Sequence, residues 1–162
     1  MATYRRETRI EAPFEEVWAF HSTTDGLEAL TPEFMHLEVE DVTGPDGDPD
    51  PDELDAGSRI ELSVQPFGVG PRQRMISAIT ERTLEDGSGM FRDVMESGPF
   101  AAWEHTHQFF ADGDETVVVD HVEYRLPGGR IGRVLSPLGR IGLEPMFRDR
   151  HRTTKRLLEK PT

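Results

Sequence analysis

The feature that most limits the possible folds is a run of alternating segments from Ser58 to Leu126. Apolar and polar side chains alternate within each segment, which is the pattern of a half-buried β-strand. Short turns rich in glycine, proline and aspartate separate the segments, and such turns join neighbouring antiparallel strands. We therefore expect a meander of consecutive strands. They are predicted at residues 58–64, 72–84, 90–96, 102–110 and 115–126.

The chain before this run predicts two further strands and two short helices. Residues 3–11 alternate and predict the first strand. Pro13 stands at the favoured first position of a helix, and apolar residues then recur at helical spacing as far as His21. A second short helix is expected at residues 26–30, where a proline soon follows. The second strand is expected at residues 34–42.

The end of the chain predicts a long helix that begins at Pro145 and follows short helical turns interrupted by Pro137. One face of the helix carries the residues that we expect to be buried. They are Leu143, Met146, Phe147, His151, Thr154, Leu157 and Leu158. The opposite face is basic, with Arg148, Arg152, Lys155 and Arg156. The whole pattern predicts an α+β fold with a single domain over residues 1–162. We expect its antiparallel sheet and C-terminal helix to enclose a pocket for a small, largely apolar molecule.

The charge and the absence of several features exclude other classes of protein. Aspartate and glutamate number 31 against 18 lysines and arginines, for a net charge of -13. Such a surface repels nucleic acid and anionic membranes, so we expect neither nucleic-acid binding nor membrane insertion. The chain has no cysteine, which excludes disulfides and thiolate sites. With no signal peptide and no apolar run of roughly 20 residues, the expected location is the cytoplasm.

The charged residues also predict how stability depends on salt. Aspartate and arginine are abundant and only Lys155 and Lys160 are lysines, a composition that resembles the proteins of salt-loving archaea. We expect the melting temperature to rise from low to molar salt, because screening relieves the repulsion between acidic groups. Thermal unfolding followed by circular dichroism over that range measures the effect. A melting temperature that stays flat or falls would contradict this prediction.

An acidic loop is predicted at residues 44–53, where aspartates alternate with glycine and proline. The alternation resembles a calcium-binding EF-hand loop. However, Pro51 stands where that loop needs glycine, and Gly57 stands where it needs a bidentate glutamate. We therefore interpret the segment as a solvated loop.

Two stretches of sequence resemble a known superfamily. Residues 10–18 resemble the start "I-x-A-P-x-x-x-V-W" of many members, and residues 91–109 resemble the pattern "F-x-D-x-x-x-G-P-F-x-x-W-x-H-x-H-x-F" of one subgroup. Asp120 and residues 124–127 continue that pattern. The superfamily is the START-like group, also called Bet v 1-like or SRPBCC, and the subgroup is the polyketide cyclase/dehydrase proteins, some of them fused to nucleoside-diphosphate-sugar epimerases. Met75 departs from the pattern, since a tryptophan is expected there.

The resemblance implies a helix-grip fold. In that fold a seven-stranded antiparallel sheet wraps around a long C-terminal helix, and two short helices follow the first strand. A hydrophobic cavity lies between the sheet and the last helix. Ligands across the superfamily include lipids, sterols, quinones and polyketides. Members include carriers, enzymes and co-chaperones, so the fold does not settle the activity. The residues that we expect to contact the ligand are Phe67, Met75, Phe91, Met95, Trp103, Tyr124, Met146 and Phe147.

A polar group is predicted within the otherwise apolar face of the sheet. His105 and His107 share strand parity with Trp103 and Phe109, so they are expected to face inward. The same reasoning points Asp93 and Asp120 inward from the neighbouring strands, close to the histidines. Three interpretations stay open. The group is structural and satisfied by hydrogen bonds, or it performs acid–base catalysis, or it binds a metal.

Three classes of function follow from the sequence. We favour binding or carrying a lipid-like, quinone-like or polyketide-like molecule. The first alternative is an enzyme of the cyclase or dehydratase type with catalytic His105, His107, Asp93 and Asp120, and the second is a protein-interaction module with an exposed apolar patch. We expect no cofactor and no resident metal, and the sequence carries no signal for the oligomeric state.

Overall fold

The computed structural model describes residues 1–160. Its seven strands form one antiparallel sheet in the order β1-β7-β6-β5-β4-β3-β2. The strands are β1 (Ala2–Ile10), β2 (Glu38–Thr43), β3 (Arg59–Val64), β4 (Gln73–Glu85), β5 (Ser88–Ser97), β6 (Ala102–Asp112) and β7 (Glu115–Arg125). The helices are α1 (Phe14–His21), α2 (Thr24–Leu30), α3 (Gly129–Leu135) and α4 (Arg140–Leu158). Short 3-10 turns occupy η1 (Glu33–Met35), η2 (Pro66–Gly68) and η3 (Ser136–Gly139).

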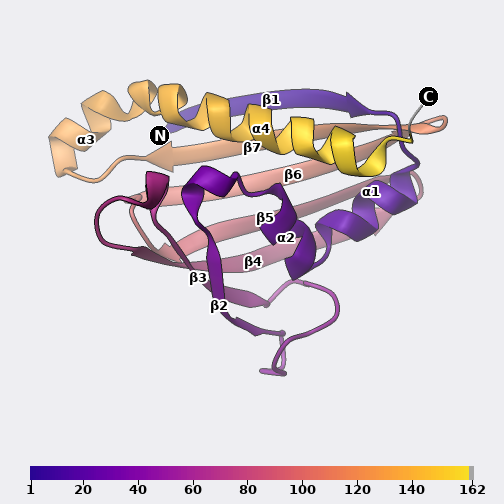
Figure 1. Ribbon diagram of the computed structural model, residues 1–162, viewed down its shortest axis with the longest axis horizontal. Coiled ribbons are helices and arrows are strands. Elements are labelled where there is room, and N and C mark those ends of the chain that lie inside the picture. The colour runs from indigo at the N-terminus through magenta and orange to yellow at the C-terminus, as the bar shows by residue number, and fades with distance from the viewer. Residues whose placement is uncertain (161–162) are drawn as a thin grey trace.

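Helices α1, α2 and α4 lie over one face of the sheet, and α4 runs along it beside β1 and β7, whereas α3 lies at the end of the sheet (Figure 1). The short helices α1 and α2 follow β1 and lie on the same side, with α2 against α4. The predicted meander is present, and β3 to β7 pair in chain order. The predicted helix-grip fold is therefore confirmed.

Two predicted elements differ in their bounds. The last helix begins at Arg140, and Pro145 lies inside it rather than at its start. Pro145 is exposed and lies only five residues after Arg140, so the helix loses one hydrogen bond near its beginning and still continues. The second strand begins at Glu38 instead of residue 34, because the chain first makes the turn η1 and His36 adopts a left-handed backbone conformation.

Within residues 1–160 the apolar core forms three clusters. One surrounds Trp18 of α1, which packs edge-on against Phe109 of β6. Gly89 makes this possible, because a Cβ atom there would lie 2.5 Å from the Trp18 ring. A second cluster joins β3 and β4 to the loops below α2, and a third joins β1 and β7 to Leu143 and Phe147 of α4.

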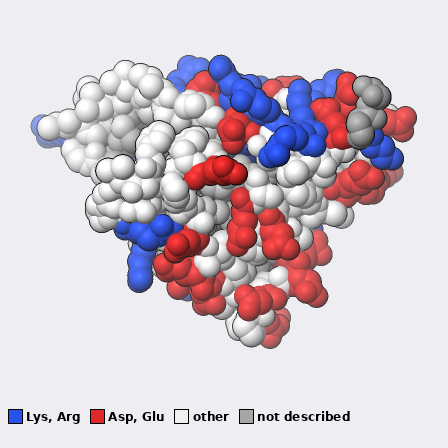
Figure 2. Space-filling view, in the orientation of Figure 1, with Lys and Arg blue, Asp and Glu red and all other residues white. Residues whose placement is uncertain are grey.

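The surface is divided between acidic and apolar regions. Acidic side chains cover much of the visible face below α4, whereas the end that carries α3 is largely free of them (Figure 2). Large apolar side chains are exposed at that end. They are Ile131, Val134, Leu135, Leu138 and Ile141. The interaction-module alternative expects an exposed apolar patch outside the pocket, and contact with another surface would bury several large side chains at this end. Among the described residues, no helix is long and apolar enough to cross a membrane.

Candidate functional site

A cavity of about 420 Å³ lies between the inner face of the sheet and helices α2 and α4. Its wall comes from both sides of the fold: Leu27 and Leu30 of α2, Leu62 of β3, Ile79 of β4 and Phe147 of α4. The clusters at β3–β4 and at β1–β7 pack separately, and the cavity occupies the space between them. Its volume falls in the range of small-molecule sites, roughly 300–1,000 Å³.

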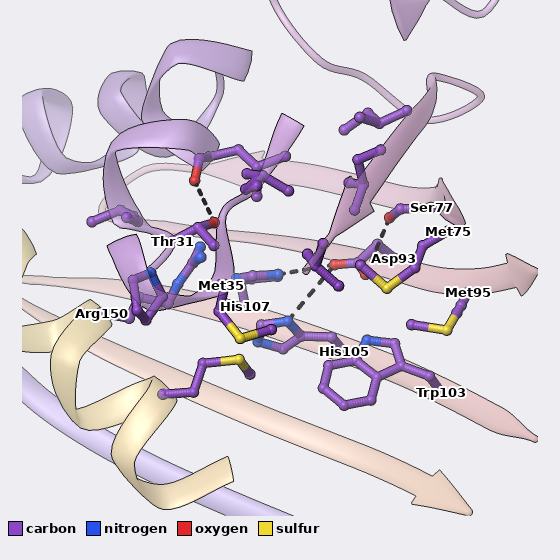
Figure 3. A pocket seen from close by; sticks show the side chains of 18 of the residues that line it. Thr31, Met35, Met75, Ser77, Asp93, Met95, Trp103, His105, His107 and Arg150 are labelled. Carbon is purple, nitrogen blue, oxygen red and sulfur yellow. Dashed lines mark hydrogen bonds and ion pairs between the residues drawn. The ribbon is translucent and has the colours of Figure 1, made fainter. Parts of the chain in front are cut away.

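Most of the predicted ligand contacts line this cavity. They are Met75, Phe91, Met95, Trp103, Met146 and Phe147. Several of these side chains are visible in Figure 3, where Met75, Met95 and Trp103 are labelled. Methionine side chains adapt to varied ligand shapes, because methionine has three rotatable bonds and a polarisable sulfur.

Two of the residues predicted to contact the ligand do not line the cavity. Phe67 is 73% exposed and stacks on Phe34, because η2 turns its side chain away from the cavity. Tyr124 is buried, but its ring lies against the turn η3, where its hydroxyl donates to the carbonyl of Ser136. Gly139 approaches that ring so closely that a Cβ atom would lie 2.5 Å from it.

Sequence reasoning missed several cavity residues. Leu27, Leu30 and Thr31 reach the cavity from α2 and its end, and Arg150 reaches it from α4. His21 also lines the cavity, and the sequence did contain a signal for it, because the helical spacing of apolar residues places His21 on the buried face of α1. The sequence contains no such signal for the residues of α2, because a helix of seven residues is too short to define a periodic apolar face.

The predicted contact between histidines and aspartates is present in the structure. His105 Nε2 lies 2.7 Å from Asp120 Oδ1, and His107 Nε2 lies 3.0 Å from Asp93 Oδ2. Both histidines are buried in the inner face of the sheet, and Asp93 is partly buried beside them. Asp93, His105 and His107 line the cavity, and the dashed lines from both histidines meet at Asp93 (Figure 3).

Asp120 is the centre of this polar group. It is 1% exposed and also accepts a hydrogen bond from His151 of α4, whose Nε2 lies 2.5 Å from Asp120 Oδ2. His107 Nδ1 lies 3.2 Å from the other oxygen. One carboxylate on β7 therefore joins two strands of the sheet to the C-terminal helix. The sequence placed His151 on the buried face of the last helix but gave no reason to expect this contact.

Burial and charge move the pKa values of the group in opposite directions. Burial, together with the neighbouring His107, lowers the pKa of His105 to about 4. Burial alone would lower the pKa of His107 too, but its contacts with Asp120 and Asp93 raise it above the ordinary value. The histidine contacts outweigh burial at Asp120, whose pKa is held well below the ordinary value. The two imidazole centres are 3.5 Å apart, so they do not readily carry a charge at the same time.

Among the residues that the structure describes, Arg150 is the only arginine or lysine that lines the cavity. Within residues 1–160, no carboxylate lies at ion-pair distance from its guanidinium. Its side chain extends toward Thr31 (Figure 3). A guanidinium in this position has donors to offer to an oxygen atom of a bound molecule.

A curved antiparallel sheet that grips a long helix, with an apolar cavity between them, defines a helix-grip protein of the hydrophobic ligand-binding kind. The chain belongs to the family described as polyketide cyclase / dehydrase and lipid transport, whose sequence profile matches residues 1–159. Among curated proteins, no match to the chain was found.

Solved structures share the fold at low sequence identity. A protein from Chromobacterium violaceum matches with a TM-score of 0.70 and 13% identity, over 99% of this chain and 100% of that chain. Norcoclaurine synthase from Thalictrum flavum, in complex with dopamine and hydroxybenzaldehyde, gives 0.64 and 16%, over 99% and 88%. The nucleoside-diphosphate sugar epimerase from Corynebacterium glutamicum gives 0.63 and 20%, over 94% of this chain and 28% of that chain. At these identities the likeness shows the fold alone.

Proposed function

We propose that this protein binds and carries a small, mainly apolar molecule of the lipid, quinone or polyketide type. The observation that carries the proposal is the cavity of about 420 Å³, whose wall is formed mostly by leucine, isoleucine, methionine and aromatic side chains. Burying an apolar molecule there removes its surface from water, which stabilises the complex by roughly 25 cal/mol for each Å² of apolar surface buried. The family description, which includes lipid transport, supports the same proposal.

The position of Arg150 indicates which chemical groups the ligand carries. A wholly apolar molecule would leave the guanidinium without a partner, whereas a carbonyl, enol or carboxylate oxygen would accept its hydrogen bonds. The preferred ligand is therefore amphipathic, with an apolar body and at least one oxygen atom that reaches Arg150.

Filling the cavity tests the proposal. Met35 lines the cavity, so Met35→Trp places a larger side chain in the space that the ligand would occupy. We expect the protein from its expression host to carry bound material that native mass spectrometry detects and solvent releases. We expect Met35→Trp to lower the affinity for an apolar fluorescent probe, anilinonaphthalene sulfonate, by at least about tenfold, or roughly 1.4 kcal/mol.

Leu138→Trp is the matched control, because Leu138 is 58% exposed on η3 and lies outside the cavity. It adds the same side chain and should leave probe binding unchanged. Probe binding that is equal in wild type and Met35→Trp, with both variants folded by circular dichroism, would contradict the proposal.

An enzyme of the cyclase or dehydratase type is the second candidate. The specific observation is that Asp93, His105 and His107 border the cavity instead of lying in a filled core. An acid and a base beside a bound polyketide would remove a proton next to a carbonyl and protonate a departing hydroxyl. These three residues are the candidates for that role, and Asp120 would position the histidines.

Incubation of the protein with an added polyketide, followed by solvent extraction and mass spectrometry, separates the two candidate functions. A carrier returns the added ligand with unchanged mass, whereas a dehydratase returns a product that has lost one water. His105→Gln should then remove turnover while leaving probe binding close to the wild-type value. Unchanged mass for every ligand that binds would reject the enzyme and leave the carrier.

A further inference from the structure

We infer that Asp93, His105 and His107 form a binding site for a divalent transition-metal ion at the wall of the cavity. Three ligand atoms converge, one from each side chain, and all lie within 4.8 Å of one another. Two imidazoles and one carboxylate are the donor set that zinc, iron and related divalent ions use in proteins. The inference is independent of the apolar ligand, because the three side chains meet whether or not the cavity is filled.

The distances between the ligand atoms suit a metal. Asp93 Oδ2 lies 3.0 Å from His107 Nε2 and 3.9 Å from His105 Nδ1. Ligands that stand about 2.1 Å from an ion are roughly 3.0 Å apart in octahedral geometry and roughly 3.4 Å apart in tetrahedral geometry. Small side-chain rotations would therefore bring all three atoms to an ion.

The surrounding hydrogen bonds orient the ligands toward the ion. His105 contacts Asp120 through Nε2, which places the proton there and leaves Nδ1 free to bind a metal. His107 Nδ1 lies 3.2 Å from the same carboxylate, so its Nε2 is the atom that points at Asp93. The Ser77 hydroxyl lies 3.4 Å from Asp93 Oδ1, which leaves Oδ2 directed at the histidines. Metal-binding histidines usually donate their second N–H to a carboxylate in this way.

The charge of the group also favours a cation. Asp93 and Asp120 bring two carboxylates into a region with little solvent, and buried charges need compensation. A divalent ion would balance both of them while the histidines stay neutral. The remaining coordination positions would face the cavity, where an oxygen atom of a bound molecule could complete them.

Titration with metal alone tests the inference. The full-length protein is first treated with a chelator, and Zn²⁺ is then added in a calorimeter, with Co²⁺ in parallel as a spectroscopic probe. We expect one ion per chain with micromolar or tighter affinity, and visible absorption of Co²⁺ bound by nitrogen and oxygen ligands. Anomalous diffraction from the wild-type protein with bound metal should place the ion about 2.0–2.2 Å from the three ligand atoms.

Variants separate this site from other places where a cation could bind. His107→Gln should remove the one-to-one binding, whereas His36→Gln, which changes an exposed histidine, should leave it intact. Asp120→Asn changes a positioning residue and should weaken binding by roughly 10- to 100-fold while keeping the Co²⁺ spectrum. Asp48→Asn in the acidic loop should have no effect.

Three results would overturn the inference. They are the absence of saturable binding, an anomalous peak outside the Asp93–His105–His107 group, and a loss of binding in Asp48→Asn that matches the loss in His107→Gln. The diffraction experiment uses the wild-type chain, so the test stands even if a ligand variant fails to fold.

Discussion

Asp120→Ala is expected to destabilise the metal-free protein by on the order of 3–5 kcal/mol, the cost of removing one partner from a buried ion pair. The substitution leaves the Nε2 atoms of His105 and His151 without their acceptor and takes a negative charge from beside His107. It also separates α4 from the sheet at the point where His151 joins them. A loss of this size is a large part of the 5–15 kcal/mol by which proteins of this kind are stable.

Urea unfolding of chelator-treated protein measures the effect, with Asp114→Asn as the control. Asp114 lies exposed in the turn between β6 and β7, so its replacement removes one acidic charge and breaks no buried contact. We expect the control to change stability by less than about 0.5 kcal/mol. An Asp120→Ala variant as stable as the control would show that the three histidine contacts contribute nothing to folding.

Acid is expected to destabilise the protein from about pH 6.5 downward, and His21 should account for about 3 kcal/mol of the loss by about pH 4.5. Burial, with the nearby charge of Arg150, lowers the pKa of His21 from 6.5 to about 3. Its Nδ1 donates to the carbonyl of Val17, and Asp120 and His107 are the other charged or titratable groups near it.

The direction follows from where protons bind. Between pH 6.5 and about 3 the unfolded chain protonates His21 and the folded chain does not, so lowering the pH favours unfolding. This stability is fully present above pH 6.5 and is lost progressively below it. His105 shifts in the same direction, whereas the raised pKa of His107 favours folding below pH 6.5 and adds no loss there.

A comparison of slopes isolates His21. The free energy of unfolding is measured by urea titration at several pH values between 7 and 4.5. His21→Gln should reduce the slope by up to about 1.4 kcal/mol per pH unit, because one fewer proton is taken up on unfolding. His36→Gln should keep the wild-type slope, since His36 is exposed. Equal slopes in all three proteins would contradict the assignment to His21.

The prediction of the candidate site depended on one local property of the chain. Side chains on a strand alternate between two faces, so the positions of His105 and His107 placed both on the face that carries Trp103 and Phe109. The same rule brought Asp93 and Asp120 to that face from neighbouring strands. It did not predict which partners would meet. Asp93 stands opposite His105 in the backbone register, yet its hydrogen bond is with His107.

The lining of the cavity departs from the sequence prediction at several residues, and the physical reasons differ. Phe67 is apolar and next to a strand, but the backbone of η2 turns it into solvent. Tyr124 has the parity of an inward-facing residue, but the turn η3 covers its ring, so the ring does not line the cavity. The contribution of α2 depends on where that short helix packs, which no pattern within Thr24–Leu30 records.

The sequence by itself determined the seven strands, the order of the elements and the inward-facing polar group, because alternation and turn residues act over a few positions. The tertiary structure alone decided that His151 of α4 reaches Asp120, 31 residues away along the chain. It also decided that the space between the sheet and the helices stays open as a cavity bordered by Asp93, His105 and His107. Both results depend on how the long helix lies across the sheet. That position is set by packing among residues from the whole chain, so no local pattern contains it.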